Sequence, residues 1–137
     1  AEIFDRVVVA VTRNVEKGTP LFSERERKDM IIFSIASLQN VKVDSFEGLM
    51  VDHAVKHGAV AAIRGLRALS VFEFEFKMAL MNRSLNENIS TLFLMPHAKY
   101  THVSSSMVRE VVSMGGTVSE YVPPHVNEAL KEKYCNE

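Results

Sequence analysis

Two arginines, Arg64 and Arg67, follow a short apolar run at the point where a buried strand is expected to end. A guanidinium group is planar and permanently charged, and it can donate two parallel hydrogen bonds to a phosphate or a carboxylate. Gly65 lies between them and lets the backbone approach a ligand closely. A surface salt bridge to Glu73 or Glu75 is the alternative explanation. The stretch "RGLR" is therefore a candidate anion site.

Three consecutive serines, Ser104, Ser105 and Ser106, precede a segment with the pattern of a helix. The first turn of a helix offers backbone N–H groups and the positive end of the helix dipole, and both attract anions. One serine would be enough to cap the helix. Three exceed that requirement, and their hydroxyls can donate to phosphate oxygens. His102 lies beside them and could contact a nucleotide, although a solvated histidine is the more common case.

A third polar loop, "TRNVEKGTP", contributes Arg13 and Lys17. In open α/β sheets, ligands bind beyond the carboxyl ends of the strands. Because all three loops follow expected strands, we expect them to meet at one edge of a sheet, which favours a polyphosphate ligand. Met50, at a loop-to-helix junction, could line an apolar channel for a ligand. The five histidines have no zinc-type spacing with cysteine or carboxylate, so no metal centre is expected from them.

The elements that must position these groups alternate along the chain. Buried strands are expected at residues 6–14, 41–46, 59–63 and 91–95. Helices are expected at residues 27–38, 48–58, 104–116 and 123–134, the first of them behind a capping box of Ser23 and Glu26. This order predicts a single α/β domain whose parallel sheet is doubly wound, with helices on both faces.

One segment, "VFEFEFK", alternates with a period of two and would fit a strand. However, Phe72, Phe76 and Leu80 also keep helical spacing, and "KMALMNRSL" is rich in helix formers. Glu73 and Lys77 form an i,i+4 pair that supports a helix. We therefore expect a helix over residues 71–85.

The composition narrows the class of protein. The chain has 137 residues, 47% of them hydrophobic and 24% charged, which is typical of one globular domain. A net charge of −1 gives no general attraction for nucleic acid. The apolar runs are too short to cross a membrane, and no secretory leader begins the chain. A single cysteine, Cys135, excludes an internal disulfide. We expect a cytoplasmic protein.

Five stretches resemble, in order, the sequence blocks of bacterial phosphopantetheine adenylyltransferase: "KGTPLFSERER", "VDSFEGLMVD", "IRGLRALSVFEFEFKMALMNR", "FLMP" and "YTHVSSSMVREV". The similarity runs from Phe4 to about Leu130. It implies a Rossmann-like nucleotidyltransferase in coenzyme A biosynthesis, which joins ATP and 4′-phosphopantetheine into dephospho-CoA and pyrophosphate. It also implies dependence on Mg²⁺, binding of CoA or dephospho-CoA, and a homohexamer.

The resemblance also implies roles for individual residues. Lys17 would hold the attacking phosphate, and it would act in catalysis together with Arg67 and Ser105. The pantetheine substrate would be bound by Lys17, Leu49, Met50, Arg64 and Asn82. ATP would be bound by Gly65, Leu66, Arg67, Glu75, Tyr100, Thr101, His102, Val103, Ser104, Ser105 and Ser106. The family often has "KKP" where this chain has "KGTP", so one inserted residue is assumed in placing Lys17.

One family motif, T/H-x-G-H on the loop after the first strand, does not occur in these 137 residues. We expect an upstream strand, loop and helix, which together need roughly 30 residues. Without the motif histidine, adenylyl transfer should fall by about 100- to 1,000-fold. Two other functions stay open. The chain could be a module that binds ATP, CoA or phosphopantetheine without turnover, or a relative that transfers a cytidylyl group.

Overall fold

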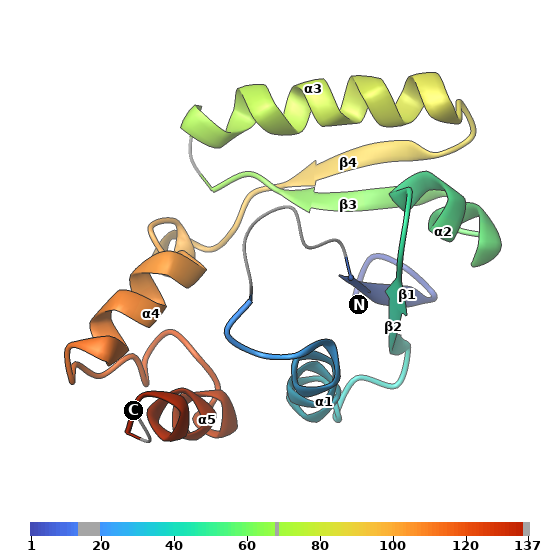
Figure 1. The fold of residues 1–137 in the computed structure, drawn as a ribbon. Coiled ribbons are helices and arrows are strands. Elements are labelled where there is room, and N and C mark those ends of the chain that lie inside the picture. Colours follow the sequence, from blue (N-terminus) through green and yellow to red (C-terminus); the bar gives the residue numbers. More distant parts are fainter. Residues whose placement is uncertain (14–19, 68, 136–137) are drawn as a thin grey trace. The chain divides into compact units, whose positions relative to one another are not determined.

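The computed structural model describes residues 1–13, 20–67 and 69–135 (Figure 1). Strands and helices alternate in the order β1 (Val7–Thr12), α1 (Glu24–Ser34), β2 (Val41–Phe46), α2 (Met50–Lys56), β3 (Ala61–Gly65), α3 (Leu69–Leu85), β4 (Ser90–Leu94), the 3₁₀ turn η1 (Ala98–Tyr100), α4 (Ser105–Ser113) and α5 (Pro124–Cys135). This alternation confirms the predicted α/β class. The chain forms two compact units, Ala1–Gly48 and Leu49–Glu137, and each is described by itself.

The first unit is a β1–α1–β2 crossover. β1 and β2 pair in parallel, from Val7 opposite Val41 to Thr12 opposite Phe46. Their β-branched residues suit a pleated surface that is covered on one face, and α1 contacts both strands. α1 begins after the predicted capping box, which is confirmed: the Ser23 hydroxyl accepts from the Glu26 N–H at 3.2 Å, and the Glu26 carboxylate accepts from the Ser23 N–H at 2.7 Å.

The second unit contains a matching crossover, β3–α3–β4. The two strands pair in parallel, from Ala61 opposite Ser90 to Gly65 opposite Leu94. The connecting helix α3 contacts β4 and also α2. The ambiguous segment is therefore helical, as predicted, and the expected Glu73–Lys77 ion pair is present at 2.6 Å.

The predicted bounds of β3 need a correction. A strand was expected at residues 59–63, but the ladder with β4 runs over Ala61–Gly65. The parallel ladder continues with Arg64 opposite Phe93 and Gly65 opposite Leu94. Both Arg64 and Gly65 have a backbone N–H and a carbonyl that can pair with the neighbouring strand. Arg64 therefore lies within the strand and not in the loop that follows it.

The pairing of the strands is parallel, as predicted, but it is confined to each unit. Among the described residues, β1 pairs with β2 and β3 pairs with β4, giving two two-stranded sheets. One continuous ladder through all four strands is therefore not formed by the described part of the chain. The assignment of residues 1–137 to a single domain stays a prediction.

Glycines end two of the helices where the sequence predicted. Gly58 after α2 and Gly115 after α4 both have positive φ, at 62° and 79°. A left-handed residue at this position lets the chain leave the helix while its last carbonyls are satisfied, and glycine adopts it without strain. The Gly115 N–H donates to the Val112 carbonyl at 2.9 Å.

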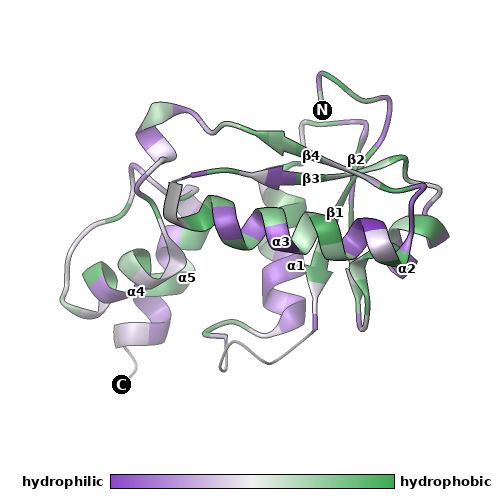
Figure 2. Cartoon of the chain, turned by 90° about the horizontal axis from the view of Figure 1, so that it is seen from above, coloured by the Kyte–Doolittle hydropathy of each residue, from purple (hydrophilic) through white to green (hydrophobic). Residues whose placement is uncertain are grey.

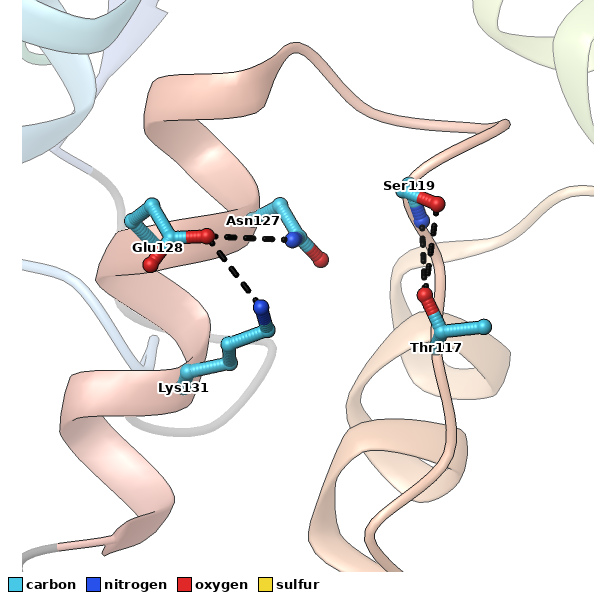
Figure 3. Close-up of polar contacts among 5 residues, drawn as sticks. All are labelled: Thr117, Ser119, Asn127, Glu128 and Lys131. Carbon is cyan, nitrogen blue, oxygen red and sulfur yellow. Dashed lines mark hydrogen bonds and ion pairs between the residues drawn. The ribbon is translucent and has the colours of Figure 1, made fainter.

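The last two helices pack against each other around a small apolar core. Val108 and Val112 of α4 are buried, as are Val118 in the connection and Leu130 of α5. Polar contacts also occur on α5 and in the connection between the two helices (Figure 3). On α5 the Glu128 carboxylate accepts from Asn127 and Lys131, and in the connection the Thr117 and Ser119 hydroxyls lie 3.2 Å apart.

Among the described helices, none combines the length and the apolar character that a membrane-spanning segment needs.

Candidate active site

The candidate site begins at the carboxyl ends of β3 and β4. The two strands point the same way, and the segments that leave them lead into α3 and toward α4 (Figure 1). The ladder extends one residue past β3, because the Leu66 N–H donates to the Leu94 carbonyl at 3.0 Å. The "RGLR" stretch and the "PHAKYTHVSSS" loop therefore start side by side, as expected for parallel strands.

A direct contact joins these two segments. Nη1 of Arg67 donates a hydrogen bond to the backbone carbonyl of Val103. Val103 immediately precedes Ser104, which is the N-cap of α4. The charge of Arg67 is thus held at the start of α4, and its side chain is exposed. The prediction that these two loops lie close together is therefore confirmed.

The three serines divide into two groups. Ser104 is half-buried, and its hydroxyl caps α4 by accepting from the Met107 N–H at 3.1 Å. Ser105 and Ser106 form the first turn of the helix and are exposed. Of the three serines, only Ser104 is therefore explained by helix capping. The hydroxyls of Ser105 and Ser106 lie where the N–H groups of a first turn and the positive end of the dipole favour an anion.

Arg64 forms a two-point ion pair with Glu75. Its Nε donates to Oε2 and its Nη2 to Oε1, both at 2.7 Å. Glu75 is only 7% exposed, whereas half of the Arg64 side chain is exposed. The Glu75 carboxylate raises the pKa of Arg64 above its already high usual value. The salt bridge that the sequence left as an alternative is thus present at Glu75, while Glu73 pairs with Lys77.

The residues expected to contact pantetheine lie on the neighbouring helices. Leu49 is the N-cap of α2, Met50 is its first residue, and Leu49 is 51% exposed. Asn82 is half-buried on α3, and α2 and α3 contact each other. The structure thus places these three residues on a connected pair of helices within the second unit.

The loop before α4 carries the remaining expected ATP contacts. Tyr100 ends η1 and is exposed, and the Thr101 hydroxyl donates to the Ala98 carbonyl at 2.9 Å. The rings of His102 and Tyr121 meet edge to face, with centroids 5.6 Å apart. This contact ties the loop to the connection between α4 and α5.

The third predicted loop lies mostly outside the described residues, and its meeting with the other two loops stays a prediction. Lys17 lies outside the described residues. Arg13 belongs to the first unit and forms an ion pair of 2.5 Å with Glu24. Its charge is therefore partly compensated by that carboxylate.

The near-complete burial of Glu75 was not predicted. The family resemblance implied a nucleotide contact for this residue, and the sequence itself named it as one possible partner of Arg64. Its two apolar neighbours, Phe74 and Phe76, could have suggested a buried position. On a helix, however, adjacent residues point in different directions, and both phenylalanines are about half exposed. The neighbours in sequence therefore did not indicate the burial of Glu75.

Comparison with known proteins places this site in a family. The profile of a family described as cytidylyltransferase-like matches residues 1–111. The phosphopantetheine adenylyltransferase of Heliobacterium modesticaldum is 51% identical over 134 residues, which cover 98% of this chain and 79% of that protein. The chain belongs to the phosphopantetheine adenylyltransferase family.

Other members of the phosphopantetheine adenylyltransferase family match equally broadly. The protein of Geobacter metallireducens is 48% identical over 96% of this chain and 80% of its own length. That of Methylococcus capsulatus is 49% identical over 98% of this chain and 83% of its own length. Matches over 96–98% of this chain include the segment from β3 to α4, which contains Arg64, Arg67 and the three serines.

Proposed function

We propose that this protein transfers the adenylyl group of ATP to 4′-phosphopantetheine, which gives dephospho-CoA and pyrophosphate in coenzyme A biosynthesis. Its family relatives carry the name of this activity. The structural observation that carries the proposal is the hydrogen bond from Arg67 to the carbonyl of Val103, directly before the N-cap of α4, whose first turn contains the exposed Ser105 and Ser106. A fixed cation, hydroxyl donors and the positive end of a helix dipole together suit a polyphosphate.

The reaction is a displacement at the α-phosphorus of ATP. An oxygen of the pantetheine phosphate forms a bond to that phosphorus, and the bond to the bridging β-phosphate oxygen breaks. Pyrophosphate leaves with the electron pair. Such a transfer needs aligned reactants and stabilised charge on the phosphate oxygens, and it needs no protein nucleophile. Arg67 and Ser105 would donate to these oxygens, and Lys17 would hold the attacking phosphate.

The other proposed contacts divide between the two substrates. Arg64 would bind the phosphate of 4′-phosphopantetheine through the exposed part of its side chain. Leu49, Met50 and Asn82 would contact the pantetheine arm. The nucleotide would be bound by Gly65, Leu66, Arg67, Tyr100, Thr101, His102, Val103, Ser104, Ser105 and Ser106. The resemblance also assigns Glu75 to the nucleotide, but its ion pair with Arg64 supports a different role.

Magnesium would accompany ATP. Arg67 and the first turn of α4 offer guanidinium, hydroxyl and N–H donors, and these groups bind phosphate oxygens in preference to a cation. Residues 100–106 contain no carboxylate. This donor set fits an ion held mainly through the ATP phosphates. Bound there, Mg²⁺ would reduce the negative charge on those oxygens. The chain's own residues would then orient the triphosphate.

We also propose a cytoplasmic homohexamer, as the family resemblance implies. Helix α3 supports association between copies, because large apolar side chains are exposed along it, including Phe72, Phe76, Leu80 and Met81. Figure 2 shows the apolar stretches along this helix. Analytical ultracentrifugation tests the hexamer, and Leu80→Glu should shift the distribution toward smaller species. A protein that sediments as a monomer at micromolar concentration would contradict the hexamer.

Pyrophosphate release tests the proposed reaction. The protein, mixed with Mg²⁺, ATP and 4′-phosphopantetheine, should release pyrophosphate and form dephospho-CoA. Neither product should appear when one substrate is left out. Binding of both substrates without turnover would favour the non-catalytic module instead. Faster turnover with CTP than with ATP would favour cytidylyl transfer.

A further inference from the structure

The Arg64–Glu75 pair uses only one side of the guanidinium. A guanidinium carries five N–H donors. The two hydrogen bonds to Glu75 come from Nε and Nη2, which form one edge of the plane. The edge made by Nη1 and the second N–H of Nη2 points away from that carboxylate. It can present two parallel N–H groups to a second planar or tetrahedral anion.

The two partners belong to rigid elements. Arg64 lies within β3, opposite Phe93 of β4, and Glu75 lies on α3. Glu75 is 7% exposed, so its carboxylate is held by its surroundings, whereas the Arg64 side chain is half exposed. A buried carboxylate with both oxygens on one guanidinium fixes both the position and the plane of that group.

We propose that Glu75 is a positioning residue for the acceptor phosphate. It holds the edge of Arg64 made by Nε and Nη2, so that the adjacent edge made by Nη1 and Nη2 meets the phosphate of 4′-phosphopantetheine. This inference rests on the proposed function and deepens it. It differs from a direct contact between Glu75 and the nucleotide, because Glu75 would act only through Arg64.

The two roles predict different kinetics. In Glu75→Gln, one carboxylate oxygen is replaced by an NH₂ group, which faces a guanidinium N–H and cannot accept from it. The two-point contact is then lost and Arg64 can rotate. We expect the KM for 4′-phosphopantetheine to rise about tenfold, because a charge-assisted hydrogen bond is lost. The KM for ATP should stay within about twofold of its original value. Glu75→Asp, which keeps the charge, should recover part of the loss.

A double-mutant cycle isolates the route through Arg64. Arg64→Lys keeps a positive charge beside the carboxylate but removes the planar two-point contact. In the Arg64→Lys background, Glu75→Gln should raise the KM for 4′-phosphopantetheine by less than about twofold, since the contact is already lost. A direct nucleotide contact predicts instead that Glu75→Gln raises the KM for ATP, and by the same factor in both backgrounds. That result would overturn the proposal.

Glu73→Gln is a matched control on the same helix. Glu73 carries the same charge two residues away, but it is exposed and pairs with Lys77. Its loss should change neither KM. A purely structural role of Glu75 would lower the melting temperature and the active fraction while leaving both KM values unchanged, which would also overturn the proposal. Should Glu75→Gln fail to fold, Glu75→Asp, whose carboxylate is one methylene shorter, should still give a smaller rise in the KM for 4′-phosphopantetheine and none in the KM for ATP.

Failure of this inference can be told from failure of the proposed function. The unaltered protein either releases pyrophosphate from the two substrates or does not, and that result does not depend on Glu75. An active protein whose Glu75 variants keep the original KM for 4′-phosphopantetheine refutes only the positioning role.

Discussion

Arg67 donates a hydrogen bond to the backbone carbonyl of Val103, one residue before the N-cap of α4. The contact joins the segment after β3 to the segment before α4, two regions that are 36 residues apart in sequence. It also occupies only part of a guanidinium with five donors. The same side chain can therefore connect the two loops and contact a phosphate at the start of the helix.

Arg67→Ala should weaken the use of ATP. Loss of a charge-assisted contact costs about 1.5–3 kcal/mol, so kcat/KM for ATP should fall by a factor of about ten or more. The melting temperature should change little, because the Arg67 side chain is exposed. Steady-state kinetics with ATP varied and thermal unfolding measure the two effects. Normal kinetics in Arg67→Ala would refute the assigned role.

Ser105→Ala should lower turnover without lowering stability. The Ser105 hydroxyl is exposed in the first turn of α4, and Ser104 supplies the cap. Loss of one donor to the transferring phosphate should reduce kcat by about 100-fold or more. Ser113→Ala in the last turn is the matched control, since its hydroxyl bonds to the Glu110 carbonyl. Equal kcat values for the two variants would exclude a catalytic role for Ser105.

Much of the fold was predictable because local physics determines it. The capping box at Ser23 and Glu26, the stop at Gly58 and the helical spacing of Phe72 and Phe76 are all short-range features, and the structure confirms each one. The bounds of β3 were less predictable. They depend on pairing with β4, which begins 25 residues after β3 ends by residue number, and no local pattern encodes that register.

In the candidate site too, local features could be predicted from the sequence and long-range contacts could not. The charge of Arg64 and the donors at Ser105 could be identified from residue types and from their places after strands. The pairing of Arg64 with Glu75 in preference to Glu73 could not. On a helix, these two carboxylates differ by about 200° in direction, and only packing decides which one is buried and paired with Arg64. Sequence alone left both possibilities open.

Gly58→Ala should destabilise the protein through the backbone alone. Gly58 has φ of +62°, and no atom lies within 4 Å of the position that a Cβ would occupy. The left-handed conformation costs an alanine about 1–2 kcal/mol, with no added clash. Gly58→Asn should cost less, because asparagine tolerates this conformation better. Urea unfolding measures both variants. An alanine variant as stable as the original would contradict the backbone assignment.

The ion pair at Glu24 should make stability depend on pH. A hydrogen bond from the Ser45 hydroxyl, followed by the contacts with Arg13, lowers the pKa of Glu24 in the folded state. A lowered folded-state pKa contributes stability above the ordinary value of about 4.3, and this contribution is lost as pH falls through the folded-state pKa. Urea unfolding should show that the original protein has a higher free energy of unfolding than Glu24→Gln at about pH 6. This difference should disappear as the pH falls to about 3.

Arg13→Gln supplies the control for this pH effect. It removes one of the groups that lower the pKa of Glu24 and leaves the Ser45 hydroxyl and Lys28 in place. In the Arg13→Gln background, Glu24→Gln should therefore change the pH dependence of the free energy of unfolding less than it does in the original protein. Added salt should reduce the difference further, because both partners are solvent-accessible. Should the original protein and Glu24→Gln lose stability in parallel throughout this range, Glu24 does not stabilise the fold by this route.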